Sequence, residues 1–160
     1  MNLKSFLTIA LMIMAISTSA QNIETDISHH EHHRNEIGLA NSPVYFIKEK
    51  ELSYDLHLHY IYNFPKTRFG LGIGYERIFD EHRHNTVGIV GSYRPLEELC
   101  FSFSPGITFE KSSSNPKFAM HLETSYEFEM GDFHLGPVFE IAYDPEDVHI
   151  SLGLHLGFGF

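Results

Sequence analysis

The amino-acid sequence predicts an all-β protein, an eight-stranded antiparallel up-and-down transmembrane β-barrel preceded by a cleaved signal peptide. Three observations lead to this fold class. The chain begins with the layout of an export signal, the remainder alternates apolar and polar residues with a period of two, and the bulky apolar residues form an aliphatic belt between two aromatic bands. The length of 160 residues fits a single domain.

Residues 1–20 carry the signal-peptide pattern. Lys4 supplies the positive charge of the n-region, residues 6–16 form a nearly unbroken apolar run, and small residues precede an expected cleavage between Ala20 and Gln21. The apolar run is too short to cross a bilayer as a helix. We therefore predict three parts: a signal peptide at 1–20, a flexible His-rich tail at 21–35 and a β-barrel at 36–160.

From residue 36 onward, apolar and polar side chains alternate as they do in strands with two different faces. The clearest case is 148–160, where every second residue from Val148 to Phe160 is apolar and the residues between them are histidine, serine or glycine. The predicted strands cover 36–47, 52–62, 69–76, 87–93, 99–109, 118–129, 133–143 and 148–160. Because all the connections are short, each joins an antiparallel hairpin and the sheet is a meander.

Two kinds of barrel fit this alternation. A soluble lipocalin-like barrel, which would bind a small apolar ligand, has its apolar face inside, whereas a transmembrane barrel has it outside. Here the polar residues of the alternation are interspersed with Gly, Ser and Ala, so this face fits a narrow barrel interior. The apolar residues that alternate with them have side chains too bulky for such an interior. Aromatic residues also gather near both strand ends, as they do at the two interfaces of a bilayer. The transmembrane arrangement is therefore the predicted one.

One set of inward-facing residues has the chemistry of a metal site. Short turns place His121 opposite Ala142, and Ala142 opposite His149, while Glu123 lies opposite Glu140. Two imidazoles and two carboxylates on one patch form a ligand set for Zn²⁺ or another divalent transition metal. The same groups also suit a purely structural network of hydrogen bonds, because narrow barrels fill their interior with polar side chains.

A second inward cluster is predicted between the strands at 52–62 and 69–76. His57 and His59 belong to it, and glycines opposite them would leave room for the imidazole rings. The predicted pairs are Asp55–Glu76, His57–Gly74 and His59–Gly72.

Two prolines interrupt the strand pattern. Pro105 and Pro137 lie within predicted strands and have no backbone N–H to donate to the ladder. We expect a bulge at each proline and a register that shifts by one residue across it.

A histidine tract in the predicted tail strengthens the metal hypothesis. Histidine-rich runs chelate transition metals, although a solvated polar tail is an equally plain interpretation. The tract contains His29, His30, His32 and His33. Together with the inward histidines, it makes binding or passage of a divalent cation the sharpest functional hypothesis, with a structural role as the alternative.

Composition excludes several other classes. The formal net charge of −10 argues against a nucleic-acid partner, because proteins that bind nucleic acids carry a basic surface. Cys100 is the single cysteine, so neither an internal disulfide nor a four-cysteine zinc site can form.

The residues from 36 to 160 resemble the small eight-stranded outer-membrane β-barrels of Gram-negative bacteria. The resemblance rests on the export signal, the even strand number, the aromatic bands and the final strand ending in Phe160. It implies a monomer in the lipid bilayer of the outer membrane, with both termini in the periplasm and Phe160 read by the barrel-insertion machinery. The connections near residues 49, 82, 113 and 146 would face outward. They are short, which disfavours an adhesin.

Some barrels of this class are lipid A deacylases with a His-x-Ser pattern and a nearby Glu. The segment from His149 to Ser151, with Glu140, matches that spacing. The pattern is only three residues long, and its side chains have inward parity, away from lipid. We therefore expect no enzymatic activity.

Overall fold

The computed structural model describes residues 33–81, 83–111, 115–145 and 147–160, and all regular structure among them is β-strand. The predicted signal peptide, its cleavage point and the tail histidines His29, His30 and His32 lie outside the described residues. None of the described residues belongs to a helix long and apolar enough to cross a membrane.

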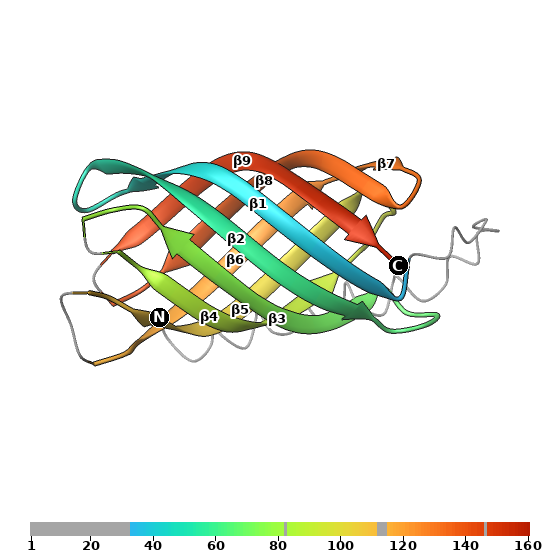
Figure 1. The fold of residues 1–160 in the computed structure, drawn as a ribbon, viewed down its shortest axis with the longest axis horizontal. Helices are drawn as coiled ribbons and strands as arrows, with labels where there is room; N and C mark the ends of the chain where they lie inside the picture. The colour runs from blue at the N-terminus through green and yellow to red at the C-terminus, as the bar shows by residue number, and fades with distance from the viewer. Residues whose placement is uncertain (1–32, 82, 112–114, 146) are drawn as a thin grey trace, which may run out of the picture. The chain divides into compact units, whose positions relative to one another are not determined.

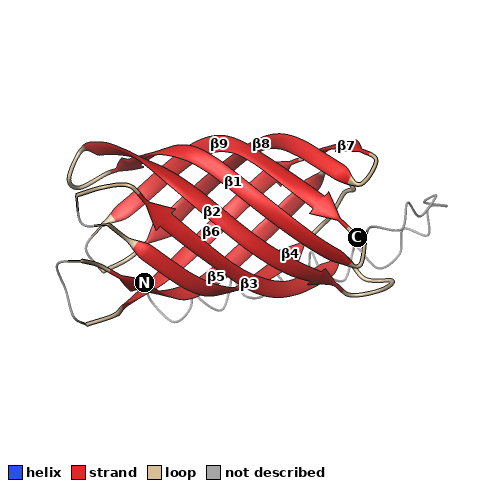
Figure 2. Cartoon of the chain, viewed as in Figure 1, coloured by secondary structure: helices blue, strands red, loops and turns tan. Residues whose placement is uncertain are grey.

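The strands form one closed antiparallel sheet (Figures 1 and 2). They are β1 (Asn35–Phe46), β2 (Glu51–Asn63), β3 (Phe69–Ile78), β4 (Asn85–Tyr93), β5 (Leu99–Phe109), β6 (Lys117–Tyr126), β7 (Phe128–Met130), β8 (Phe133–Tyr143) and β9 (Val148–Gly159). From β1 to β6 each strand pairs with the next, β6 and β7 both pair with β8, β8 pairs with β9, and β9 pairs with β1. Because β6 and β7 pair with β8 in one continuous register, they are two parts of one strand. The barrel therefore has eight strands, as predicted.

The barrel has two distinct ends (Figure 1). The β1–β2, β3–β4, β5–β6 and β8–β9 connections lie at the end we call the loop end. The β2–β3, β4–β5 and β7–β8 turns lie at the opposite end, beside the start of β1 and the C-terminus, and we call this the terminal end.

The registers predicted for the last three hairpin strands are confirmed. His121 lies opposite Ala142, which lies opposite His149, and Glu123 lies opposite Glu140. The short turns between these strands leave little freedom in pairing, so the sequence alone places the residues correctly.

The predicted register between β2 and β3 is wrong by two residues. The observed pairs are Asp55–Ile78, His57–Glu76 and His59–Gly74 in place of Asp55–Glu76, His57–Gly74 and His59–Gly72. The reason is that β2 continues to Asn63, which pairs with Gly70. The Phe64 N–H then donates to the Phe69 carbonyl at 2.9 Å, so the turn is centred one residue later than the pattern indicated.

The expected shifts at the two prolines are also wrong. Pro105 lies opposite Met120 and Pro137 opposite Leu154, each in the same register as the residues on either side. The pairing of β4 with β5 is interrupted near Pro105 but resumes without an extra residue. The missing donor therefore leaves a gap in the ladder and does not rotate the strand.

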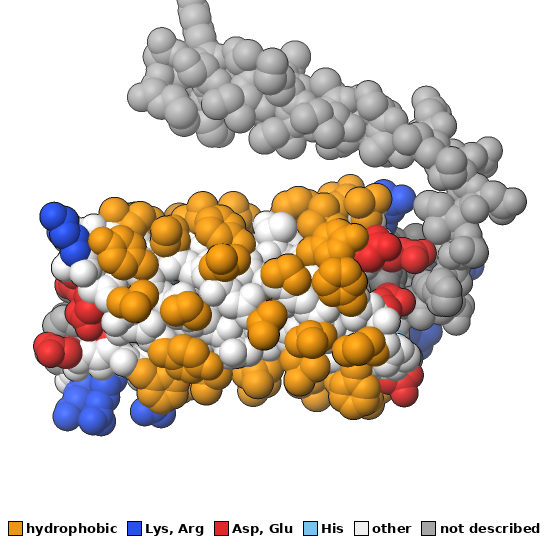
Figure 3. Space-filling view, turned by 90° about the horizontal axis from the view of Figure 1, so that it is seen from above, with side chains coloured by type: hydrophobic (Ala, Val, Ile, Leu, Met, Phe, Trp, Pro, Cys, Tyr) orange, Lys and Arg blue, Asp and Glu red, His pale blue; other side chains and the backbone are white. Residues whose placement is uncertain are grey.

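The apolar face is on the outside, as predicted. Leu71 and Leu152 are 51% and 64% exposed, whereas His121 and Glu123 are 4% and 5% exposed. Apolar side chains cover the visible wall, and charged residues gather at the two ends (Figure 3). An apolar outer wall with a polar interior is the arrangement of a transmembrane barrel and the reverse of a lipocalin-like one, so the soluble alternative does not fit.

Side chains close the interior near both ends. Near the loop end, the buried side chains of Val44, Phe46 and Ile78 pack together, and the Phe46 ring centre lies 5.1 Å from that of His149. Near the terminal end, Arg94 extends inward between Glu36 and Glu127 and donates hydrogen bonds to both carboxylates. The interior therefore has a buried apolar cluster near one end and a buried guanidinium near the other.

The outward orientation predicts how the wall responds to charge. Replacing Leu154, which is 52% exposed in the middle of β9, by Arg should make folding into lipid vesicles less favourable by about 2–4 kcal/mol, because the guanidinium enters hydrocarbon. Leu96→Arg in the β4–β5 turn is the matched control, since Leu96 is 59% exposed outside the strands, and should cost little. Equal costs at the two positions would contradict the orientation.

Candidate metal centre in the barrel lumen

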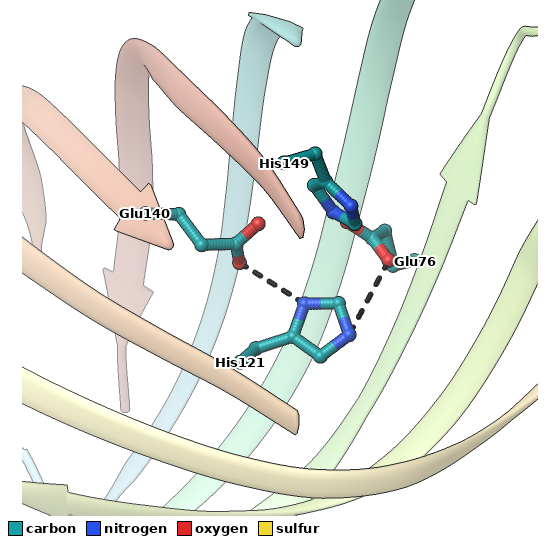
Figure 4. Close-up of side chains that lie close together, drawn as sticks. All are labelled: Glu76, His121, Glu140 and His149. Atoms are coloured by element: carbon teal, nitrogen blue, oxygen red, sulfur yellow. Dashed lines mark hydrogen bonds and ion pairs between the residues drawn. The ribbon is translucent and has the colours of Figure 1, made fainter. Parts of the chain in front are cut away.

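Four residues near the loop end form a compact cluster inside the barrel (Figure 4). Glu76 comes from β3, His121 from β6, Glu140 from β8 and His149 from β9, and we call them the loop-end cluster. One ligand atom from each residue can be chosen so that all four lie within 4.8 Å of one another. His121 Nδ1 lies 3.3 Å from Glu140 Oε2, and its Nε2 lies 3.6 Å from Glu76 Oε2.

The cluster is buried and its polar atoms are incompletely paired. All four residues are at most 4% exposed. Both carboxylate oxygens of Glu76, both ring nitrogens of His149 and Oε1 of Glu140 have no hydrogen-bond partner. Buried polar atoms without partners are costly, so a set of them converging on one point could be satisfied by a bound cation or by water.

The chemistry of this donor set fits Zn²⁺ or a similar ion. Imidazole nitrogen and carboxylate oxygen are ordinary zinc ligands, and neighbouring ligand atoms in a tetrahedral site lie about 3.3 Å apart. His149 Nε2 is 3.9 Å from Glu76 Oε1, so small side-chain movements would bring the four groups onto one ion. Two carboxylates would also balance the charge of a divalent cation.

The structure brings together three of the four residues predicted for this site and replaces the fourth. His121, Glu140 and His149 are present as expected, but Glu123 turns toward His57, whose Nδ1 lies 3.4 Å from Glu123 Oε2. Glu76 takes its place from the opposite wall of the barrel. Hairpin pairing could not reveal this contact, because β3 and β6 are not neighbours in the sheet.

The second predicted cluster is divided by the structure. His57 joins Glu123 and also lies 4.0 Å from Glu140, which links it to the loop-end cluster. His59 instead lies next to His155, with their Nε2 atoms 3.4 Å apart. The idea that glycines leave room for the rings holds for His57, because a Cβ on Gly74 would come within 2.8 Å of its Nε2 atom. For His59 the glycine is Gly38 in place of Gly72, since a Cβ on Gly38 would collide with both His59 and His155.

Several inward residues near the terminal end were not predicted as site residues. Glu36, Glu127, His134 and His155 surround the Arg94 guanidinium and one another. The inward parity of His134 and His155 is visible in the sequence, so the alternation could have found them. Arg94 directly follows β4, has the inward parity of Ser92 and donates its backbone N–H to the Arg68 carbonyl at 2.8 Å, but the predicted strand ended at Tyr93 and so left it out.

The interior has an imbalance of charge among the described residues. Its carboxylates are Glu36, Asp55, Glu76, Glu123, Glu127 and Glu140. The Arg94 guanidinium is the permanent cation that pairs with two of them. Buried carboxylates need compensation. The remaining negative charge must be met by protonated histidines, by protonated carboxyls or by bound cations.

Two other predicted features lie elsewhere. Of the tail histidines, His33 is described; it is exposed, and its Nε2 lies 3.3 Å from Asp132 Oδ1 near the terminal end, away from the lumen clusters. The His149–Ser151 pattern of the deacylase hypothesis faces the interior, where both residues are at most 4% exposed. A nucleophile in that position does not meet lipid.

The fold and the polar interior define a small eight-stranded transmembrane β-barrel. The structure is similar to that of Ail, the attachment invasion locus protein of Yersinia pestis, with a TM-score of 0.57, 14% identity, and 81% of this chain and 99% of that chain covered. It is similar to Neisserial surface protein A with a TM-score of 0.59, 9% identity, and 79% and 96% covered. For the N-terminal β-barrel domain of Pseudomonas aeruginosa OprF, the values are 0.53, 15%, 81% and 100%.

These likenesses establish the fold that the sequence resemblance implied, that of the small outer-membrane barrels. Ail is an outer membrane protein whose backbone structure is also known in a phospholipid bilayer nanodisc. No protein-family model and no curated protein sequence matches the chain.

A separate ionisable pair lies in the β3–β4 connection, outside the strands. His84 Nδ1 donates to Asp80 Oδ2 at 2.6 Å, and His84 Nε2 lies 3.4 Å from Glu110 Oε1. Burial lowers the pKa of His84, but the hydrogen bond and the negative charges of Asp80 and Glu110 outweigh it, so the pKa is raised above its usual value.

This pair predicts a pH dependence of the loop end. Because the folded pKa of His84 is raised, its stabilising contribution is full below pH about 6.5 and is lost as the pH rises through the folded pKa. Asp80→Asn should lower the pKa of His84 and reduce that pH dependence. An NMR titration of the His84 ring measures it, and an unchanged pKa in the variant would contradict the assignment.

Proposed function

We propose that the protein is a bacterial outer-membrane β-barrel that binds a divalent transition-metal cation, such as Zn²⁺, within its lumen. The observation that carries the proposal is the loop-end cluster: two imidazoles and two carboxylates from four strands, buried, within 4.8 Å of one another and short of hydrogen-bond partners. The fold supports the membrane location, and the unbalanced negative charge of the interior favours a cation over an anion.

The alternative function is structural, with the same residues forming a network that fills the lumen. The contacts of His121 with both Glu140 and Glu76 support it, because a protonated imidazole would bridge the two carboxylates without a metal. The two functions differ in one measurable respect. An ion that binds the folded state stabilises it increasingly, with the logarithm of its concentration above the Kd, whereas a completed network gains nothing from added metal.

Calorimetric titration of the refolded chain with Zn²⁺ should show micromolar or tighter binding. Glu76→Gln should weaken the loop-end binding step by more than about tenfold, because it removes an anionic ligand. Ser102→Ala is the matched control, since Ser102 is buried in the same lumen but belongs to no candidate metal group. Heat-modifiable gel migration shows that each variant folds, and Zn²⁺ should raise the unfolding temperature of the parent chain more than that of Glu76→Gln. A titration without heat above buffer would remove the metal proposal and leave the structural one.

The membrane assignment includes recognition of the last strand by the barrel-insertion machinery. Phe160 is 52% exposed, and its ring stacks at 6.0 Å on that of Phe158. Phe160→Ser should reduce the heat-modifiable protein in outer-membrane fractions severalfold. Phe118→Ser is the control, since Phe118 is also 52% exposed but lies at the loop end of β6, and it should assemble nearly normally. Equal loss in both variants would point to general destabilisation, and release of the parent chain without detergent would contradict the membrane assignment.

A further inference from the structure

We propose that the lumen contains a second divalent transition-metal site, formed by Glu36, His59 and His155 in the terminal half of the barrel. Ligand atoms of these three residues lie within 4.8 Å of one another, and all three side chains are at most 5% exposed. The site shares no residue with the loop-end cluster, so it does not depend on the function proposed above.

The two imidazoles have the spacing of a shared metal ion. Their Nε2 atoms lie 3.4 Å apart, and the rings are stacked with centroids 5.1 Å apart and an interplanar angle of 14°. Two nitrogen ligands of a tetrahedral zinc ion are about 3.3 Å apart. Glu36 Oε1 lies 3.9 Å from His59 Nε2 and 3.4 Å from His134 Nε2, and it makes a hydrogen bond to neither, so it is the carboxylate oxygen available to an ion.

Neighbouring residues hold these ligands as outer partners hold the ligands of known metal sites. Arg94 Nη2 donates to Glu36 Oε2 at 2.8 Å, which fixes the carboxylate and leaves Oε1 directed at the imidazoles. On the far side of the second ring, His155 Nδ1 lies 3.4 Å from Glu127 Oε1 without a hydrogen bond between them, so a small movement of either group would complete that contact. A carboxylate on the non-ligating nitrogen of a histidine orients the ring and increases its basicity toward a metal.

The backbone makes room for this arrangement at one residue of β1. Gly38 pairs with His59 on one side and with Gly157 on the other. A Cβ at Gly38 would collide with the Nε2 atoms of both His59 and His155, the atoms that would bind the ion. The glycine is therefore what allows the two imidazoles to approach each other.

The two sites should differ in strength. The loop-end cluster offers four protein ligands with two carboxylates, whereas this site offers three with one carboxylate and keeps an open position for water. The Arg94 guanidinium is also close to it and disfavours a further positive charge. The second site should therefore fill at higher Zn²⁺ concentration than the first.

The test is the number of Zn²⁺ ions bound per refolded chain, measured by equilibrium dialysis with metal analysis. Each single variant is compared with the parent chain, so that binding by the tail histidines cancels. His59→Gln should bind one ion fewer, His149→Gln should bind one fewer through the loop-end cluster, and the double variant should bind two fewer. Ser102→Ala should match the parent. Heat-modifiable migration checks folding, and His155→Gln replaces His59→Gln if that variant does not fold.

The outcomes separate the two proposals. If His59→Gln and His155→Gln bind as many ions as the parent while His149→Gln loses one, the two histidines are hydrogen-bonded to each other and the second site is wrong. If His149→Gln binds as many as the parent while His59→Gln loses one, the second site stands and the loop-end proposal fails. Binding that no lumen variant changes would overturn both.

Discussion

Closure of the sheet is the constraint on which the rest of this structure depends. In hydrocarbon, backbone N–H and C=O groups have no water to bind, so a sheet can cross a bilayer only if its first and last strands pair. Here the pairings of β9 with β1 and of β6 with β8 complete that ring. Closure divides every strand into an outer and an inner face, and it makes the inner face of a barrel this small too narrow for bulk water.

The narrow interior explains why so much chemistry is concentrated in it. Side chains that alternate inward from neighbouring strands are forced into contact across the lumen, as Glu76 and His121 are from opposite walls. Interior carboxylates outnumber the buried Arg94, so their charge is met by protonated histidines, by protonated carboxyls or by cations that the histidines would help to bind. With or without a bound cation, the protonation or ligation of the imidazoles affects the stability of the buried carboxylates.

Local pattern was sufficient for most of the fold, because a period of two over thirteen residues at the C-terminus determines which face is which, and short turns determine the pairing. It failed where a turn was centred one residue later than its residues indicated, between Asn63 and Gly70, which moved His57 and His59 away from their expected partners. The sequence also predicted three of the loop-end ligands. It could not predict the contacts that Glu76 and Arg94 make across the lumen, because these contacts depend on how the strands are arranged around the barrel.

The position of the Phe46 ring bears on how the barrel interior exchanges protons or ions with the loop end. It is 2% exposed and lies against the rings of both His149 and His84, between the interior and the ionisable pair of the β3–β4 connection. A proton or ion that passes between the interior and the β3–β4 connection at this point must displace the Phe46 ring. Exchange along this path therefore requires the movement of one buried aromatic side chain.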